Sequence, residues 1–229
     1  MASNNIDNIE PLINTEFNNL KILDLSLNRL DDKANEVFSK LNYNNLENLN
    51  LSFNYFTQFN LFKSLEHFKK LKKLDLFSNK FTEDIEDLMK DKNLEYNLQS
   101  LEEINLSLGV FYEKSIKLIS KFIFEKLEIL HLSSNNLTSL SFIDYLKYVK
   151  ENENRYEIVK KYDYPLKKLV LTNNEISDIS KLSNLNKLEE IEIQNNCIII
   201  NQSVNNIVEN IKSLEKILLF GNKLERKNI

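Results

Sequence analysis

Residues 46–56, LENLNLSFNYF, decide the fold, because the chain carries eight lines of this pattern. The lines begin at Leu20, Leu46, Leu71, Leu101, Leu127, Leu166, Leu188 and Leu214. The steps between them are 26, 25, 30, 26, 39, 22 and 26 residues. Self-similarity at intervals of this size is typical of stacked structural repeats.

Each line predicts a short strand with one buried face, because apolar residues alternate within it. In the first line Leu23 and Leu25 point one way, and Ile22 and Asp24 point the other. A strand this short must pair with its counterpart in the next repeat, and parallel pairing needs a crossover connection. We therefore expect a parallel sheet on the inside of an arc and helices on the outside.

Helical stripes appear in three of the connections. Their apolar residues are Ala34, Val37, Phe38 and Leu41, then Ile116, Ile119 and Ile123, then Val204, Ile207, Val208 and Ile211. These connections predict crossover helices.

The ninth place of each line follows the strand, where the turning backbone would bury unpaired peptide groups. An asparagine amide can donate to and accept from such groups. Seven lines have asparagine there: Asn28, Asn54, Asn79, Asn135, Asn174, Asn196 and Asn222. The fourth line has Gly109 instead. Because glycine permits the turn but has no amide, we expect a local break there, bridged by water.

The pattern LxxLxLxxNxL over residues 20–224 resembles the leucine-rich repeat family. The resemblance implies an α/β fold, a curved right-handed solenoid of eight repeats with its parallel sheet on the concave face and helices on the convex face. It also implies that the seven asparagines form the family's stacked ladder. Residues 166–198 are similar to repeats of the phosphatase-1 regulatory subunit and tubulin-folding cofactor E. The longer first five repeats are closer to ribonuclease inhibitor, Ran GTPase-activating protein and tropomodulin.

The ends of a solenoid expose apolar edges that need covering. We expect an N-terminal cap at residues 1–19, the repeat domain at 20–224 and a polar tail at 225–229. A short helix in the cap would turn four apolar residues inward: Ile9, Leu12, Ile13 and Phe17. The C-terminal edge is expected to lack a cap and to be able to pair with another chain.

An insertion of about residues 138–165 separates repeats five and six. It predicts a helical face of Phe142, Tyr145, Leu146 and Val149 that continues through Tyr156 and Val159. Because tyrosine is enriched at interfaces, Tyr145, Tyr148 and Tyr156 are candidates for a second binding surface. The alternative is that these rings pack back onto the solenoid.

The solvent side of the predicted sheet carries the third, fifth and seventh places of each line. The candidate protein-binding residues there are Ile22, Asp24, Asn50, Lys73, Asp75, Phe77, Asn105, Ile129, His131 and Ser133. Such a polar, partly acidic row with isolated apolar anchors suits an extended protein partner. No catalytic group is expected, because Asp75 lies on a different strand from His131 and Ser133 and no nucleophile elbow is present.

Composition narrows the function further. The net charge of −4 and the absence of a dense basic run disfavour nucleic acid. No apolar run approaches the length of a membrane span, and the first residues lack the pattern of a secretion signal. One cysteine and two glycines leave no multi-cysteine metal cluster and no glycine-rich phosphate loop, so no cofactor or metal is expected. A monomer in the cytoplasm, with the nucleus as an alternative, is expected.

The function expected from these observations is a non-catalytic protein-binding scaffold. The resemblance implies an alternative, a regulatory or activating subunit for an enzyme such as protein phosphatase 1 or a small GTPase. The GTPase-activating relatives work with an arginine and an asparagine on their loops, and Arg29 with Asn28 is the pair here. A third interpretation is a factor that handles tubulin or actin.

Overall fold

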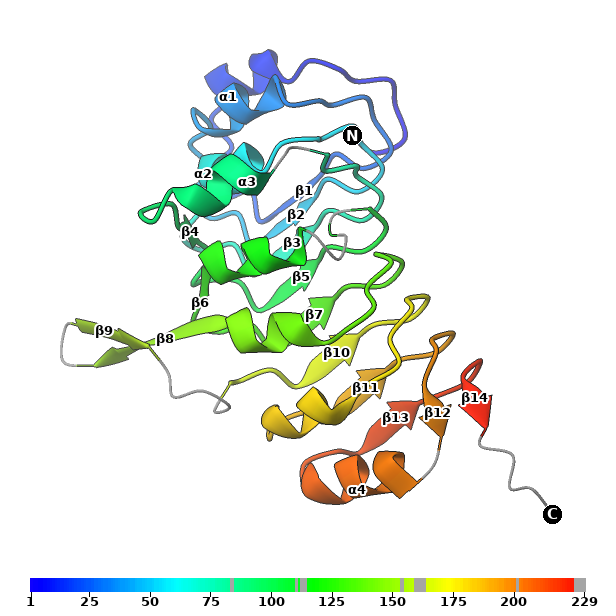
Figure 1. The fold of residues 1–229 in the computed structure, drawn as a ribbon. Coiled ribbons are helices and arrows are strands. Elements are labelled where there is room, and N and C mark those ends of the chain that lie inside the picture. The colour runs from blue at the N-terminus through cyan, green and yellow to red at the C-terminus, as the bar shows by residue number, and fades with distance from the viewer. Residues whose placement is uncertain are drawn as a thin grey trace.

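The computed structural model describes residues 1–82, 85–109, 111, 115–152, 155–158, 164–200 and 202–224. Within them, eight parallel strands form one continuous sheet (Figure 1). The strands are β1 (Ile22–Asp24), β2 (Asn48–Asn50), β3 (Lys73–Asp75), β5 (Glu103–Asn105), β7 (Ile129–His131), β10 (Lys168–Val170), β11 (Glu190–Glu192) and β13 (Lys216–Leu218). Their pairing keeps the fourth-place residues in register from Leu23 to Ile217. The predicted α/β repeat solenoid is confirmed.

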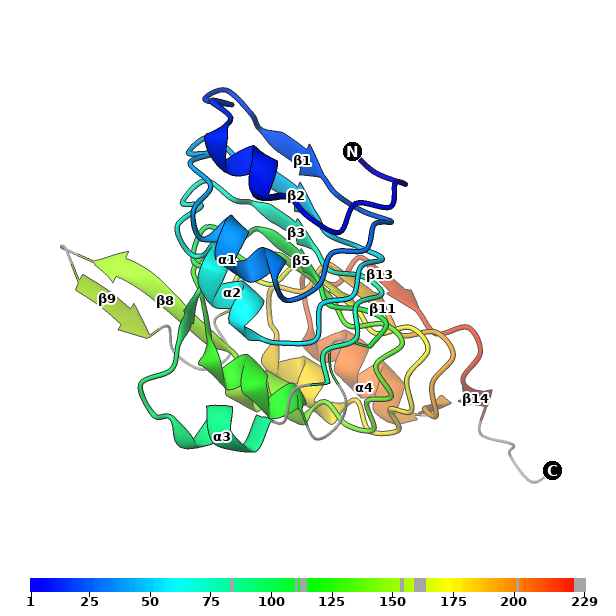
Figure 2. The ribbon, with the colours of Figure 1, turned by 90° about the horizontal axis from the view of Figure 1, so that it is seen from above.

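Short helices cover the other side of this sheet, as Figure 2 shows for α1, α2 and α4. The α-helices are α1 (Ala34–Phe38), α2 (Asn60–Leu65), α3 (Ile85–Lys90) and α4 (Gln202–Asn210). The 3-10 helices are η1 (Glu10–Asn14), η2 (Ile116–Lys121), η3 (Ser141–Tyr145) and η4 (Ser180–Asn184). Their apolar residues join the leucines of the sheet in one core that runs through all the repeats, although those of α3 are only partly buried.

The helix expected through Ile123 is corrected, because η2 ends at Lys121 and β6 (Phe122–Phe124) follows. β6 lies between β4 (Tyr96–Asn97) and β8 (Lys147–Asn152) in a second sheet, which β9 (Arg155–Ile158) completes. Aromatic and β-branched side chains favour a strand here. A two-stranded sheet joins β12 (Ile199–Ile200) to β14 (Lys223–Leu224).

An aromatic cluster fills the core from the second to the fourth repeat, around the 30-residue step between Leu71 and Leu101. The buried rings are Phe59, Phe62, Phe81, Tyr96, Phe111 and Phe122. The rings of Phe62 and Phe122 lie 4.7 Å apart, and those of Phe59 and Phe111 lie 5.8 Å apart. Contacts between large rings therefore contribute much of the packing in this part of the core.

The ninth-place asparagines join neighbouring repeats by hydrogen bonds. Asn54, for example, donates to the carbonyls of Leu25 and Leu51, each at 3.0 Å, and accepts from the amide of Leu30 at 3.0 Å. Asn79, Asn135, Asn174, Asn196 and Asn222 likewise donate to a carbonyl of the preceding repeat. These bonds satisfy buried peptide groups that the sheet leaves unpaired.

The local break expected at Gly109 is wrong, because β3, β5 and β7 pair there in register. Phe81 is at the eleventh place of its line. In the first two lines, the amide at this place donates to the ladder asparagine of the next repeat. The Phe81 amide donates instead to the Gly109 carbonyl at 3.2 Å. The amides of Gly109 and Phe111 both donate to Asn135, at 3.1 and 3.2 Å. A backbone carbonyl thus accepts the bond that the missing side chain would have accepted, and a φ of 95° at Gly109 accompanies that geometry.

Residues 1–6 adopt the second half of a repeat. Asn4 donates to the carbonyl three residues before it, as Asn28 does, and Ser3 has the positive φ that Leu27 has. The amide of Ile6 donates to Asn28 at 3.1 Å. The segment therefore extends the hydrogen-bonded edge of the solenoid beyond β1.

The cap helix is only the short η1, which follows this half-repeat. Ile9 and Leu12 are buried and Ile13 is half-buried. Phe17 is exposed, and its ring lies 5.8 Å from that of Tyr43. The expectation that Phe17 points inward is wrong, because η1 ends at Asn14 and the chain continues along the surface.

The helical face expected in the insertion is also wrong. Only η3 is helical, and β8 and β9 form an antiparallel hairpin that projects from the solenoid (Figure 1). Phe142, Leu146 and Val149 are buried as apolar residues should be, but they do not share a helix. Val159 lies outside the described residues.

Candidate functional site

The sheet presents the ten candidate residues on or just after its strands. Ile22 and Asp24 lie on β1, Asn50 on β2, Lys73 and Asp75 on β3, Asn105 on β5, and Ile129 and His131 on β7, while Phe77 and Ser133 follow β3 and β7. This row spans the first five repeats. In-register pairing sets neighbouring side chains about 4.8 Å apart, so contacts across strands follow directly.

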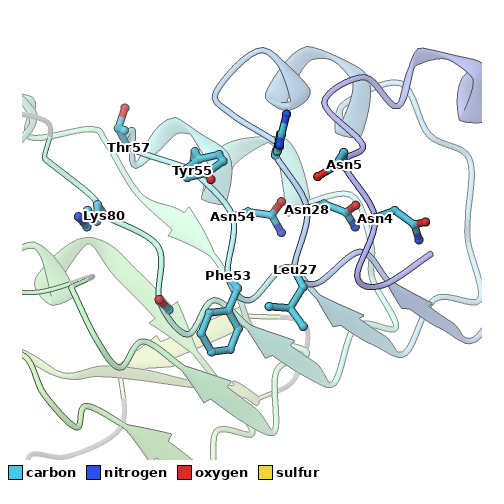
Figure 3. A pocket seen from close by; sticks show the side chains of 11 residues that line it. Asn4, Asn5, Leu27, Asn28, Phe53, Asn54, Tyr55, Thr57 and Lys80 are labelled. Atoms are coloured by element: carbon cyan, nitrogen blue, oxygen red, sulfur yellow. The ribbon is translucent and has the colours of Figure 1, made fainter.

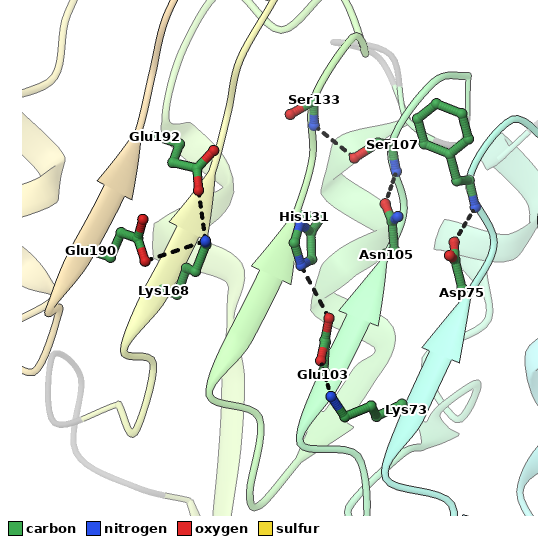
Figure 4. A network of polar contacts seen from close by, with 11 residues as sticks. Lys73, Asp75, Glu103, Asn105, Ser107, His131, Ser133, Lys168, Glu190 and Glu192 are labelled. Atoms are coloured by element: carbon green, nitrogen blue, oxygen red, sulfur yellow. Dashed lines mark hydrogen bonds and ion pairs between the residues drawn. The ribbon is translucent and has the colours of Figure 1, made fainter. Parts of the chain in front are cut away.

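Charged contacts link side chains at the third and fifth places across the strands (Figure 4). Lys73 lies 2.8 Å from Glu103, and Glu103 lies 3.4 Å from Nε2 of His131. Towards the C-terminus, Lys168 lies 3.3 Å from Glu190 and 2.6 Å from Glu192, and Lys216 also pairs with Glu190. Many charges on this face are therefore satisfied within the chain.

Side chains at the fifth place stabilise the turns that follow the strands. Asp24, Asn50, Asp75 and Asn105 each accept a hydrogen bond from the amide two residues later, at 2.9 to 3.1 Å. Such a bond stabilises the chain as it leaves the strand. The side chains remain half-buried, so they combine a structural role with exposure to the concave surface.

An acidic hollow of about 290 Å³ lies on the N-terminal part of the sheet, with Ile22, Asp24, Asp75, Glu103 and His131 among its lining residues. Burial raises the pKa of Asp75, although the hydrogen bond from Phe77 opposes this shift. Burial lowers the pKa of His131, and the charge of Glu103 only partly offsets it. We call this hollow the acidic hollow.

The pKa of Glu103 moves the other way. Burial alone would raise it, but the hydrogen bond and charge of Lys73, helped by His131, hold it below its ordinary value. Asp24 and Asp75 form no ion pair with a described residue. The acidic hollow therefore presents carboxylates without a basic partner.

The polar groups near His131 do not assemble a hydrolase triad. The imidazole lies against Glu103, and the Ser133 amide donates to the Ser107 hydroxyl at 3.0 Å. Asp75 accepts from the Phe77 amide.

Among the described residues, no group of three or more His, Cys, Asp or Glu side chains could hold a metal ion. In the same part of the chain, no helix is long and apolar enough to cross a membrane.

An apolar ridge borders the concave face, and only one of its three members, Phe77, was expected from the sequence. It consists of Leu27, Phe53 and Phe77, with the rings of Phe53 and Phe77 5.1 Å apart. Leu27 is 49% exposed and Phe53 is 45% exposed. Both occupy the eighth place of their lines, beside the ladder, where the reasoning had examined only the third, fifth and seventh places. Large apolar residues at the eighth place, which four other lines fill with serine or asparagine, were the sequence signal that could have indicated this ridge.

A groove of about 570 Å³ lies along the outer side of this ridge (Figure 3). Leu27 and Phe53 lie side by side in it, and Tyr55, Arg29 and Lys80 also line it. We call it the edge groove. It is separate from the acidic hollow, and no residue lines both.

The tyrosines of the insertion divide into different environments. Tyr148 is fully buried, its hydroxyl donates to the Leu127 carbonyl at 3.1 Å, and its ring lies 4.9 Å from that of Tyr164. Its assignment to a second interface is therefore wrong, because the ring packs into the core. Tyr145 is 36% exposed and remains a candidate. Tyr156 lies on β9, and its side chain is outside the described part of the structure.

Comparison with known proteins adds three findings. The family described as Leucine Rich Repeat matches residues 126–146. Protein PAC2 of Saccharomyces cerevisiae is 28% identical over 204 residues, which cover 84% of this chain and 37% of the yeast protein. The chain thus spans well under half the length of that relative.

Two solved structures share the architecture. Human 5T4, a trophoblast glycoprotein, has a TM-score of 0.62 at 18% identity over 97% of this chain and 76% of its own. Internalin C2 of Listeria monocytogenes has a TM-score of 0.52 at 20% identity over 83% of this chain and 68% of its own. These likenesses bear on the fold alone. With the matching repeat and the in-register sheet, they show that the chain has the leucine-rich repeat fold.

Proposed function

We propose that this chain is a non-catalytic scaffold that binds a protein partner on the N-terminal part of its concave face. The observation that carries the proposal is Ile22, which is 63% exposed on a sheet strand beside the acidic hollow. An exposed apolar side chain next to carboxylates without ion-pair partners suits a partner protein that presents an apolar side chain flanked by lysine or arginine. The leucine-rich repeat fold is typical of such scaffolds.

The charge distribution favours this end of the sheet over the other. At the C-terminal end, Lys168 and Lys216 already neutralise Glu190 and Glu192. At the N-terminal end, Asp24 and Asp75 have no such counter-charge among the described residues. Burying carboxylates without a partner costs free energy, so a basic partner residue gains most at this end.

A capture experiment tests the proposal. The combined variant Ile22→Arg, Asp24→Asn, Asp75→Asn keeps the turn hydrogen bonds, because Asn50 and Asn105 make the same bonds. A control of equal charge change, Glu36→Gln, Asp87→Asn, Glu209→Gln, alters exposed helix positions. Tagged proteins are incubated with extract of the source cells, and the recovered proteins are quantified by mass spectrometry. We expect the concave variant to lose the partner at least about tenfold and the control to keep it.

Equal recovery with both variants would move the partner off this face. The identity of the partner separates the remaining alternatives: a phosphatase catalytic subunit or a small GTPase indicates a regulatory subunit, and tubulin or actin indicates a cytoskeletal factor. Asn28 is buried in the ladder and donates to Leu25, which weighs against a direct role beside Arg29 in activating a GTPase. A fluorescent fusion tests the proposed cytoplasmic location, and light scattering tests the proposed monomer.

A further inference from the structure

The edge groove carries a row of side chains at the tenth place of the first three lines. Arg29, Tyr55 and Lys80 follow one another there, one repeat apart. All three are exposed, Tyr55 by 61%. Below this row lie the apolar side chains of Leu27 and Phe53 (Figure 3). The groove therefore combines a cationic and aromatic rim with an apolar floor.

The charges of the groove are of one sign and are available. Arg29 and Lys80 are the only ionisable side chains among the lining residues besides the Tyr55 phenol. Neither forms an ion pair or side-chain hydrogen bond with a described residue. This contrasts with the concave face, where Lys73 and Lys168 are held by glutamates. An anionic partner is thus attracted to the edge groove and repelled by the acidic hollow.

The backbone at the floor of the groove is held in a conformation that apolar residues disfavour. Leu27 has a φ of 54° and Phe53 has a φ of 54°, in the left-handed region. The same place in the sixth and seventh lines is occupied by Asn173 and Asn195, and asparagine tolerates this region best after glycine. A bulky apolar residue there costs stability and leaves the side chain in water, so the first two repeats retain strain at an exposed surface.

From these observations we propose that the edge groove binds an acidic, apolar segment of a partner protein in extended conformation. Carboxylates of the segment pair with Arg29 and Lys80, and an apolar side chain between them covers Leu27 and Phe53. This surface is distinct from the concave face, so the protein has two recognition sites of opposite charge preference.

The spacing of the two cations defines the segment further. Arg29 and Lys80 follow strands β1 and β3, two strands apart, which corresponds to about 10 Å. In a polyproline-II conformation residues i and i+3 share a face and lie about 9 Å apart. The segment is therefore expected to carry acidic residues three positions apart with an apolar residue between them.

Fluorescence anisotropy with a defined peptide tests the proposal. The probe is a fluorescein-labelled dodecapeptide with Glu-Leu-Phe-Glu at its centre and Gly-Ser flanks. We expect saturable binding to the full chain that weakens at least about tenfold in the double variant Arg29→Glu, Lys80→Glu. Binding should also weaken with added salt, because both cations are exposed to screening.

Matched controls give the test its specificity. The variant Lys117→Glu, Lys126→Glu makes the same charge change at exposed lysines outside the groove and should bind the peptide as the unaltered chain does. A peptide with lysine in place of both glutamates, and one with serine in place of Leu-Phe, should bind at least about tenfold more weakly. Equal loss in both protein variants, or binding of a single-stranded oligonucleotide as tight as that of the peptide, would overturn the proposal.

Asparagine at the strained places separates binding from folding. The variant Leu27→Asn, Phe53→Asn fits the left-handed backbone, so its Tm should rise by about 2 °C or more while its affinity for the peptide falls at least about tenfold. A merely structural role predicts the opposite, a lower Tm. A variant that is more stable and still binds fully would refute a role for these two side chains.

Discussion

At the residue scale, the asparagine ladder shows how one side chain satisfies two repeats. Asn135 is fully buried, accepts from the amides of Gly109 and Phe111, and donates to the Leu106 carbonyl at 2.8 Å. Its carbonyl thus serves two donors of the preceding repeat, which has no ladder asparagine of its own. Asn135 is the most heavily used point of attachment around the irregular fourth repeat.

Replacing Asn135 with alanine should therefore be costly. Two buried or half-buried amides and one carbonyl lose their partner, and each unsatisfied group costs roughly 1–3 kcal/mol. We expect the free energy of unfolding to fall by about 3 kcal/mol or more, as measured by urea denaturation. Thr172→Ala, at a half-buried concave hydroxyl, serves as the comparison. An equal loss in both variants would contradict the ladder's importance at this position.

The carboxylate of Asp75 predicts a pH-dependent stability. Burial raises its pKa in the folded protein, so its contribution to stability is complete below the ordinary aspartate pKa and is lost as the pH rises through the raised value. Asp75→Asn retains an acceptor for the Phe77 amide, as Asn50 does for Ser52. We expect this variant to have a higher Tm than the unaltered chain at pH 7. The difference should shrink as the pH falls through the raised pKa and should vanish below about 4; a constant difference at all pH values would contradict the assignment.

At the element scale, the strands were predictable because the alternation of leucines repeats in register, and tertiary pairing reinforces each copy. The connections were less predictable. The stripe through Ile116, Ile119 and Ile123 fits a helix as well as it fits a 3-10 turn followed by a strand. Only the pairing of β6 with β4 and β8, from residues far away in the sequence, decides between them. Local periodicity contains no information about that pairing.

The insertion shows the same limit for candidate site residues. The sequence identified its tyrosines as candidates for a binding surface, but it could not show which of the rings are exposed and which pack into the core. Tyr148 fills the core between Phe124 and Tyr164, whereas Tyr145 is exposed. The concave residues were predictable from their places in each line, because the strand period fixes which side chains share a face.

The two tyrosines should respond differently to truncation. Tyr148→Ala removes a buried ring and its hydrogen bond to Leu127, so the free energy of unfolding should fall by about 3–5 kcal/mol. Tyr145→Ala should change it by less than about 1 kcal/mol. Thermal denaturation followed by circular dichroism measures both. Loss of partner binding in Tyr145→Ala with its fold intact would therefore locate a contact on the insertion, whereas loss in Tyr148→Ala would report misfolding.

At the scale of the whole molecule, a single core runs through repeats of unequal length. The aromatic cluster bridges the fourth repeat, and the sheet continues through it without a change of register. Each repeat contacts chiefly its neighbours, so the stability of the junctions decides whether the solenoid unfolds as one unit. Because the junction at Gly109 keeps its backbone hydrogen bonds, the structure favours one unit.

We accordingly expect a single cooperative transition in urea. The chain has nine tyrosines and no tryptophan, so tyrosine fluorescence reports on packing while far-ultraviolet circular dichroism reports on the backbone. The two probes should give coincident midpoints. Two separated transitions would show that the repeats before and after Gly109 unfold independently.

The hydrogen bond from the Phe81 amide to the Gly109 carbonyl has a consequence for mutagenesis. Both atoms belong to the main chain, so alanine scanning of either position leaves them in place and would attribute any effect at Gly109 to lost flexibility. Chemical ligation can replace the amide nitrogen of Phe81 with an ester oxygen, which deletes this donor and leaves every side chain unchanged. The difference in unfolding free energy between this semisynthetic protein and the unaltered chain would measure the contribution of the hydrogen bond.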